Sequence, residues 1–315
     1  MQFNNEKKYD IIRIDLIRLK VVKEHINLKK RGKAMANINI YAFADEASPN
    51  IDEQIVAMKK NGLQGLEIRN VDGTNVSKIT IEKAKEVRKK MDDAGLITWS
   101  IGSPIGKIDI EKDDFAAHLD ELKHTLELAD VLGAKNLRMF SFFIPKDKNP
   151  EDYRNEVIDR IGKFVEVAFG SGVALCHENE KGIYGDTAAR CLDLFENIRE
   201  LEGVFDPANF VQCGQNTLEA WEMLKDYIKY FHVKDAFYDG SVVPAGCGEG
   251  NLKIIVPDYI KNGGFRFTME PHLFAFTGLD KLEQEGNESL LATRYTFKSN
   301  EEAFDAACDA FKALL

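Results

Sequence analysis

The stretch ADVLGAKNLRMFSF, residues 129–142, contains the unit that decides the fold. An apolar stripe at helical spacing, which includes Leu122 and Leu126, predicts an amphipathic helix over 115–132. Gly133 follows at the position of a left-handed helix cap, and a short apolar strand is then expected over 136–142. A helix, a glycine and a buried strand therefore follow one another within a few residues.

The same unit recurs along the chain. Strands are predicted at 38–44, 65–69, 97–101, 136–142, 173–178, 203–206, 230–233 and 265–270. Helices are predicted at 51–61, 81–94, 115–132, 153–169 and 217–227, with cap glycines at Gly62, Gly95, Gly133 and Gly263. Eight strands that alternate with helices favour a single-domain (β/α)8 TIM barrel. An open doubly wound sheet is disfavoured, because the segment after the first strand, 44–49, has no glycine for a phosphate-binding loop.

The composition is that of an acidic globular protein. Hydrophobic residues make up 44% and charged residues 30% of the chain, and the net charge is −10. No uncharged apolar run is long enough to cross a membrane, and the acidic balance disfavours nucleic acid as a partner. The five cysteines are scattered and form no C-x-x-C pair, and no signal peptide is apparent, so we expect a reduced, cytoplasmic setting.

The first 36 residues differ from the rest of the chain. They carry ten Lys or Arg against four Asp or Glu, and charged residues interrupt every candidate for the apolar core of a signal peptide. We expect residues 1–36 to be a basic N-terminal appendage, either disordered or a mis-assigned start in which Met35 is the true first residue. Residues 37–315 are expected to form the barrel.

Polar residues follow the last four predicted strands, in the segments 177–180 (HENE), 205–209 (FDPAN), 232–235 (HVKD) and 269–272 (MEPH). In a barrel, the C-terminal ends of the strands form the active site. One residue from each segment provides three carboxylates and an imidazole, namely Glu178, Asp206, His232 and Glu270. These donors suit Mn²⁺, Mg²⁺ or Co²⁺ and are compatible with Zn²⁺. Because converging carboxylates repel one another, the sequence predicts one divalent cation among them.

With these motifs the chain resembles the sugar-phosphate isomerase/epimerase superfamily, the xylose isomerase-like barrels that also include metal-dependent apurinic endonucleases. The matching pieces are 66–69 (LEIR), 178–179 (EN), Asp206, 232–235 (HVKD), 270–272 (EPH) and the glycine-rich 246–251 (GCGEGN). The resemblance runs from about residue 38 to the C-terminal helix. It implies a single ion of the Mn²⁺ type held by Glu178, Asp206, His232 and Glu270, with Glu178 and Glu270 also serving as acid and base.

The chemistry of such a site can be argued from the residue types. A metal that chelates a carbonyl and a neighbouring hydroxyl acidifies the C–H between them and stabilises an enediolate. Two carboxylates on opposite faces of that carbon can remove a proton from one side and return one to the other, which epimerises the carbon. If the proton is returned to the adjacent carbon instead, the sugar is isomerised. We therefore predict a metal-dependent isomerase or epimerase of carbohydrate metabolism, acting on a sugar or a sugar-like ketone.

Further residues at the strand ends are candidates for substrate binding. They are Glu67, Arg69, Arg138, His177, Glu180, Lys234 and His272, and ion pairs inside the barrel are the alternative role for Glu67, Arg69 and Arg138. Glu180 also competes with Glu178 as the metal ligand, because residues two apart on a strand share a face. We favour Glu178, since Glu180 lies beyond the strand. The glycines at 246–251 are interpreted as a lid-like loop, because the flanking elements of a dinucleotide site are absent.

Three other functions fit parts of this pattern. A metal-dependent dehydratase of an inositol-derived ketone would use the same enediolate. An apurinic endonuclease would need additional histidines for its metal cluster, and this chain has six in all. A non-catalytic sugar-binding barrel would not need both Glu178 and Glu270. The resemblance also suggests a homodimer or homotetramer, with a small carbohydrate as substrate.

Overall fold

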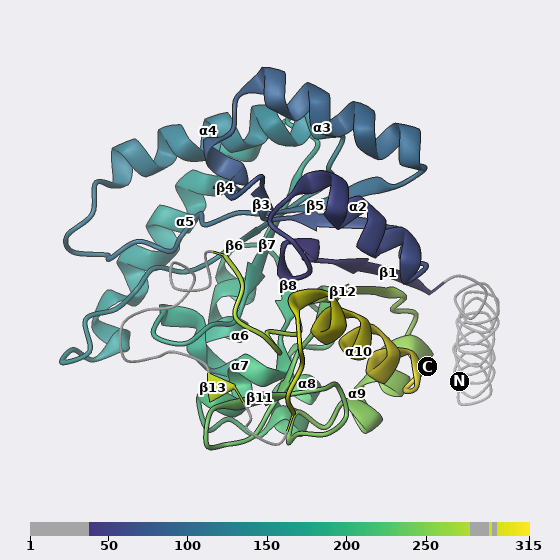
Figure 1. Cartoon of the computed structure of the whole chain (residues 1–315). Coiled ribbons are helices and arrows are strands. Elements are labelled where there is room, and N and C mark those ends of the chain that lie inside the picture. The colour runs from purple at the N-terminus through teal and green to yellow at the C-terminus, as the bar shows by residue number, and fades with distance from the viewer. Residues whose placement is uncertain (1–37, 278–289, 292–294) are drawn as a thin grey trace, which may run out of the picture.

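Eight parallel strands close into a barrel in the computed structural model of the protein, which describes residues 38–277, 290–291 and 295–315 (Figure 1). Each strand pairs with the next along the chain, and the last pairs with the first. The strands are β1 (Asn39–Ala42), β2 (Gly65–Ile68), β5 (Ile97–Gly102), β6 (Asn136–Met139), β7 (Ala174–Glu178), β8 (Glu202–Phe205), β9 (Ile228–Val233) and β12 (Arg266–Met269). All eight predicted strands and the single-domain (β/α)8 TIM barrel are confirmed.

The strand after the cap at Gly133 is shorter than predicted. The apolar run continues to Phe142, but β6 ends at Met139, and the Phe140 N–H then donates to the Ile105 carbonyl oxygen rather than to a barrel neighbour. Phe142 has a positive φ of 65°, which no strand accommodates. The apolar residues beyond the strand are buried in a loop, so hydrophobicity alone overestimated its length.

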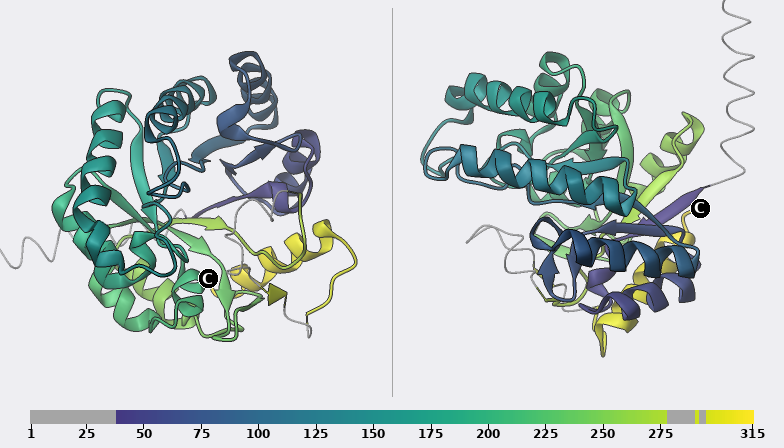
Figure 2. Two further views of the ribbon diagram at one scale, coloured as in Figure 1. Left: turned by 90° about the vertical axis from the view of Figure 1, so that its left-hand side faces the viewer. Right: turned by 90° about the horizontal axis from the view of Figure 1, so that it is seen from above.

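Helices surround the strands (Figure 2). Five correspond to the predicted helices, namely α2 (Ile51–Lys60), α3 (Ile81–Ala94), α4 (Phe115–Leu132), α5 (Arg154–Ala168) and α8 (Thr217–Leu224). The others are α6 (Ala188–Asn197), α7 (Pro207–Gln212), α9 (Leu252–Lys261) and α10 (Asn300–Lys312), with 3-10 turns η1 (Ala44–Glu46), η2 (Val76–Lys78), η3 (Pro150–Tyr153) and η4 (Tyr184–Asp186). All four predicted cap glycines have positive φ, between 62° and 94°. In the part of the chain that the structure describes, no helix is both long and apolar enough for a membrane span.

The main hydrophobic core lies between the barrel and the helices, and a second set of side chains fills the barrel itself. Inside the barrel, Tyr41 and Trp99 stack with ring centroids 4.8 Å apart, and the Tyr230 ring contacts Trp99 edge-on at 5.8 Å. Aromatic packing therefore closes the end of the barrel at which the strands begin. The other end, at the C-termini of the strands, is lined by buried polar side chains.

Short strands extend from the barrel beyond the C-terminal ends of β2 and β9. A hairpin of β3 (Asn70–Val71) and β4 (Thr74–Asn75) follows β2, and a three-stranded sheet joins β10 (Asp235–Ala236), β11 (Ser241–Val243) and β13 (Leu290–Leu291). The predicted appendage of residues 1–36 lies outside the described residues, and its interpretation stays a prediction.

Candidate metal centre and active site

Four buried side chains meet at the C-terminal mouth of the barrel. Glu178 ends β7, Asp206 follows β8, His232 lies near the end of β9, and Glu270 follows β12. Each offers one ligand atom, and these atoms all lie within 4.8 Å of one another. The exposed fractions of the four residues are between 0% and 3%. β7, β8, β9 and β12 are consecutive in the barrel, so the four predicted ligands line one side of the mouth.

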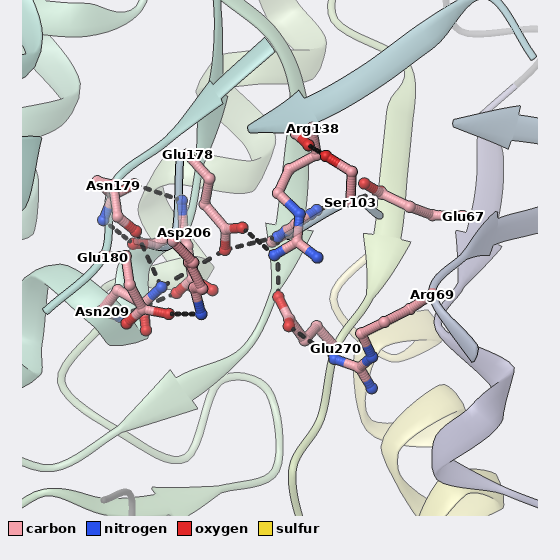
Figure 3. A network of polar contacts seen from close by, with 12 residues as sticks. Glu67, Arg69, Ser103, Arg138, Glu178, Asn179, Glu180, Asp206, Asn209 and Glu270 are labelled. Atoms are coloured by element: carbon pink, nitrogen blue, oxygen red, sulfur yellow. Dashed lines mark hydrogen bonds and ion pairs between the residues drawn. The ribbon is translucent and has the colours of Figure 1, made fainter. Parts of the chain in front are cut away.

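Asp206 is held by the start of the short helix α7. Its side chain caps the helix by accepting the Asn209 N–H at 2.9 Å, and Pro207 occupies the first helical position. Asn179 joins β7 to the same point, because its amide donates to the Asp206 carbonyl oxygen at 2.8 Å and accepts the Asp206 N–H at 3.0 Å. The backbone around Asp206 is therefore fixed from both sides (Figure 3).

His232 lies between three carboxylates. Its Nδ1 is 2.9 Å from Glu178 Oε1 and 2.8 Å from Glu270 Oε2, and its Nε2 is 3.1 Å from Glu67 Oε2. Glu67 Oε1 accepts the Tyr230 hydroxyl at 2.7 Å. Burial would lower the pKa of His232, but Glu178, Glu67 and Glu270 together raise it well above its usual value. Nδ1 therefore faces the other candidate ligands, while Glu67 orients the ring from behind.

Arginines hold the two glutamates. Arg138 Nη1 lies 2.8 Å from Glu178 Oε2, and Arg69 Nη1 lies 3.1 Å from Glu270 Oε1 (Figure 3). Burial alone would raise the pKa of each glutamate, but neighbouring cations outweigh this effect and lower the pKa below its usual value. These cations are His232 and Arg138 for Glu178, and Lys234 and His232 for Glu270. Both carboxylates are therefore ionised near neutral pH.

Lys234 pairs with the third carboxylate. Its Nζ lies 2.9 Å from Asp206 Oδ2 and 3.9 Å from Glu270 Oε2. Burial raises the pKa of Asp206 to about 7, although Lys234 opposes the shift. A buried carboxylate with so high a pKa gains from a nearby cation, since cation binding offsets the cost of its charge.

The donor set fits a divalent metal ion. Three carboxylates and one imidazole nitrogen within 4.8 Å of one another match the ligand types of Mn²⁺, Mg²⁺, Co²⁺ and Zn²⁺ sites. Glu270 Oε2 and Asp206 Oδ2 are buried and accept no hydrogen bond of good geometry, although His232 Nδ1 lies 2.8 Å from the first and Lys234 Nζ lies 2.9 Å from the second. Buried oxygens in this condition are rare unless a further partner is bound.

The structure separates Glu180 from these four residues. Glu180 Oε2 lies 2.9 Å from Lys107 Nζ, and although burial raises its pKa, Lys107 and neighbouring lysines lower it to about 2. His177 also lies apart, because it points to the helix layer, bonds Ser141 Oγ at 3.0 Å and packs on Phe195. The predicted substrate contact of His177 is therefore not supported by its position, since it faces away from Glu178.

Sequence analysis missed an acidic pair that follows β1. Arg69 pairs with Asp45 at 2.9 Å and with Glu46 at 3.3 Å, which is the ion-pair role given above as the alternative to substrate binding. His272 Nε2 lies 3.5 Å from both Glu46 and Glu270, and burial raises the pKa of Glu46 to about 8. No motif marks the carboxylates of the segment 44–49, so the sequence gives no signal of their role.

Comparisons with known proteins agree with this architecture. A family profile described as xylose isomerase-like TIM barrel matches residues 55–261. No curated protein matches the chain. Among solved structures, an L-ribulose 3-epimerase aligns with a TM-score of 0.67 at 19% identity, covering 88% of this chain and 93% of that one.

Two further solved structures are similar to the chain. The IolI protein with a bound zinc atom aligns with a TM-score of 0.66 at 15% identity, covering 88% of this chain and 98% of that one. The probable 3-DHS dehydratase AsbF from Bacillus anthracis aligns with a TM-score of 0.66 at 14% identity, covering 87% and 98%. At these identities the likeness shows the shared fold.

Proposed function

The chain belongs to the xylose isomerase-like TIM barrel family, and on that basis we propose that it is a divalent-metal-dependent isomerase or epimerase of a sugar or sugar-like ketone. The observation that carries the proposal is the convergence of Glu178, Asp206, His232 and Glu270 at the barrel mouth, buried and within 4.8 Å of one another. The zinc-bearing and epimerase neighbours support a metal and a carbohydrate substrate. Mn²⁺ is the ion that we expect first.

In this proposal the four residues hold the ion, which when bound polarises a substrate carbonyl and lowers the pKa of the adjacent C–H. Glu178 and Glu270 are the proton acceptor and donor. They approach from β7 and β12, the two outer strands of the four that carry the ligands, with β8 and β9 between them. Arg138 and Arg69 fix their orientation and keep them ionised, as a base requires.

The remaining polar residues of the mouth have supporting roles in this proposal. Lys234 and His272 lie beside Glu270 and are placed to contact substrate hydroxyls. Glu67 orients His232, and Asn179 orients Asp206, so both residues position the ligands without touching the substrate. Three of the seven residues that sequence analysis named as candidates for substrate binding, Glu67, Arg69 and Arg138, are thus assigned here to the support of the ligands.

The test is hydrogen exchange at the carbon next to the carbonyl. The purified protein is incubated with Mn²⁺ and a panel of ketoses in D₂O, the metal is removed with EDTA, and the sugars are examined by NMR. We expect deuterium at that carbon and a new epimer or isomer for at least one ketose. Absence of exchange across pentuloses, hexuloses and cyclic polyol ketones would remove the support for proton transfer.

The likeness to the probable dehydratase AsbF supports a second candidate, the loss of water from a ketone. Both reactions begin with the same proton removal and differ in whether the carbon is reprotonated or a β-hydroxyl leaves. The same experiment separates them. A product lighter by one water, with an NMR signal of a new double bond, would favour the dehydratase, and a deuterated epimer would favour the proposal above.

A further inference from the structure

The glycine-rich loop 246–251 encloses a side chain of the protein itself. The Asp235 carboxylate accepts the backbone N–H groups of Gly246, Gly248 and Gly250, each at 2.9 Å, and that of Ala236 at 3.0 Å. Asp235 has 0% of its surface exposed. Successive N–H groups that converge in this way form an anion-binding concavity. Here the protein's own carboxylate occupies it.

Glycine is required for this close approach. A Cβ at Gly248 would lie 2.4 Å from Asp235 Oδ1, and one at Gly250 would lie 2.7 Å from the same atom. The loop therefore owes its glycines to Asp235 rather than to a ligand. In a TIM barrel, loops after the last strands commonly bind the phosphate of a substrate, and this loop follows β9, the seventh strand of the barrel.

The buried cations around the mouth are also occupied by carboxylates of the protein. Arg69 pairs with Asp45, Glu46 and Glu270, and Arg138 pairs with Glu178 through Nη1, although its buried Nε has no hydrogen-bond partner. Lys234 pairs with Asp206 at 2.9 Å, and Lys107 pairs with Glu180 at 2.9 Å. The half-buried Lys181 donates to Gln212 at 2.9 Å.

The charges at the mouth are predominantly negative. Four cations, Arg69, Arg138, Lys107 and Lys234, face six buried carboxylates, which are Asp45, Glu67, Glu178, Glu180, Asp206 and Glu270, besides Glu46, whose pKa is raised by burial. A divalent cation among them still leaves no surplus of positive charge in the described part of the mouth. Moving a phosphate dianion out of water into such surroundings is unfavourable unless cations or N–H groups replace its hydration.

Building on the proposed function of this site, we propose that the substrate is an uncharged ketose or polyol ketone without a phosphate group. In the part of the mouth that the structure describes, the N–H groups of the glycine loop and the ammonium groups of Lys107 and Lys234 are already bound to carboxylates of the protein. Lys234 and His272, the polar side chains beside Glu270, suit the hydroxyl groups of a substrate. A hydroxyl group can donate a hydrogen bond to a carboxylate as well as accept one from a cation. A free sugar therefore matches the mouth, and its phosphate ester does not.

The test compares free ketoses with their phosphate esters. D-fructose is paired with D-fructose 6-phosphate and D-ribulose with D-ribulose 5-phosphate, and deuterium exchange is measured as above with Mn²⁺. We expect kcat/KM to be at least about tenfold higher for the free member of any pair that exchanges. Equal or faster exchange of the ester would overturn this inference and leave the proposed function standing. Exchange with no member of the wider ketose panel would count against the proposed function, and against this inference with it.

A pair of variants tests the physical cause. Glu180→Gln removes the charge that holds Lys107, so we expect the ester-to-free ratio of kcat/KM to rise by about tenfold. Glu222→Gln is the matched control, because it removes an exposed carboxylate of α8 that pairs with Lys225, outside the mouth. An unchanged ratio in Glu180→Gln would contradict the claim that pairing with carboxylates excludes the phosphate.

Discussion

Glu178 and Glu180 are two positions apart, yet the structure gives them different partners. Glu178 lies with Asp206, His232 and Glu270, and Glu180 lies against Lys107. We expect Glu178→Gln to lose metal affinity by at least about 100-fold, because one charged ligand is removed. Glu180→Gln is the control and should bind the metal as the unaltered protein does. Isothermal titration with Mn²⁺ measures both, and full-affinity binding by Glu178→Gln would remove Glu178 from the ligand set.

Glu67 contributes to the proposed metal site through its contact with His232. Its Oε2 lies 3.1 Å from His232 Nε2, and its other oxygen accepts the Tyr230 hydroxyl. Partners that orient a ligating histidine change metal affinity by about 10–100-fold when they are replaced. We expect a weakening in that range for Glu67→Gln and a smaller one for Tyr230→Phe, measured by competition with a chelator. Unchanged affinity in Glu67→Gln would show that packing alone orients the ring.

Among the helices, α4 is fixed to its surroundings by polar contacts at its N-terminal half. His118 Nε2 accepts the Gly106 N–H at 2.8 Å, and Glu121 lies 2.8 Å from Lys78 and 3.3 Å from His118 Nδ1. Ser77 also donates to Glu121 at 2.7 Å. Sequence analysis alone did not reveal this role, because the partners come from elements that are distant along the chain.

The pH dependence of stability follows from the same contact. Burial raises the pKa of Glu121, but hydrogen bonds from His118, Lys78 and Ser77 outweigh it and lower the pKa to about 2. The stabilisation is therefore complete above the usual pKa near 4.5 and is lost as the pH falls from there towards 2. We expect Glu121→Gln to lower the free energy of unfolding by roughly 1–2 kcal/mol at pH 7. The difference from the unaltered protein, followed by thermal unfolding, should shrink below pH 4.5, and a constant difference would contradict the assignment.

For the whole molecule, stability depends on barrel closure between β1 and β12. Their register runs from Asn39 beside Arg266 to Ala42 beside Met269. All barrel strands lie within residues 39–269, so we expect a chain that lacks residues 1–36 to keep its unfolding midpoint within about 4 °C. A chain that begins at Asp45 is the comparison. It lacks β1, which leaves β12 and β2 with open edges, and it should fail to form a soluble monomer. A large loss of stability in the first truncation would show that residues 1–36 belong to the fold.

The sequence by itself determined the repeating unit and the four candidate ligands. Hydrophobic spacing and cap glycines are local properties, so the eight strands and five of the helices could be predicted from neighbouring residues. Glu178, Asp206, His232 and Glu270 could be named because a barrel gathers the C-terminal ends of its strands at one mouth.

Only the tertiary structure decided the partners of these residues. Closure of the barrel brings Asp45 and Glu46, which follow β1, beside Arg69 from β2 and Glu270 from β12. It also turns His177 towards the helices and directs Asp235 into the glycine loop. The physical reason is that charges and hydrogen bonds act through space over a few ångströms, whereas these residues lie up to about two hundred positions apart along the chain.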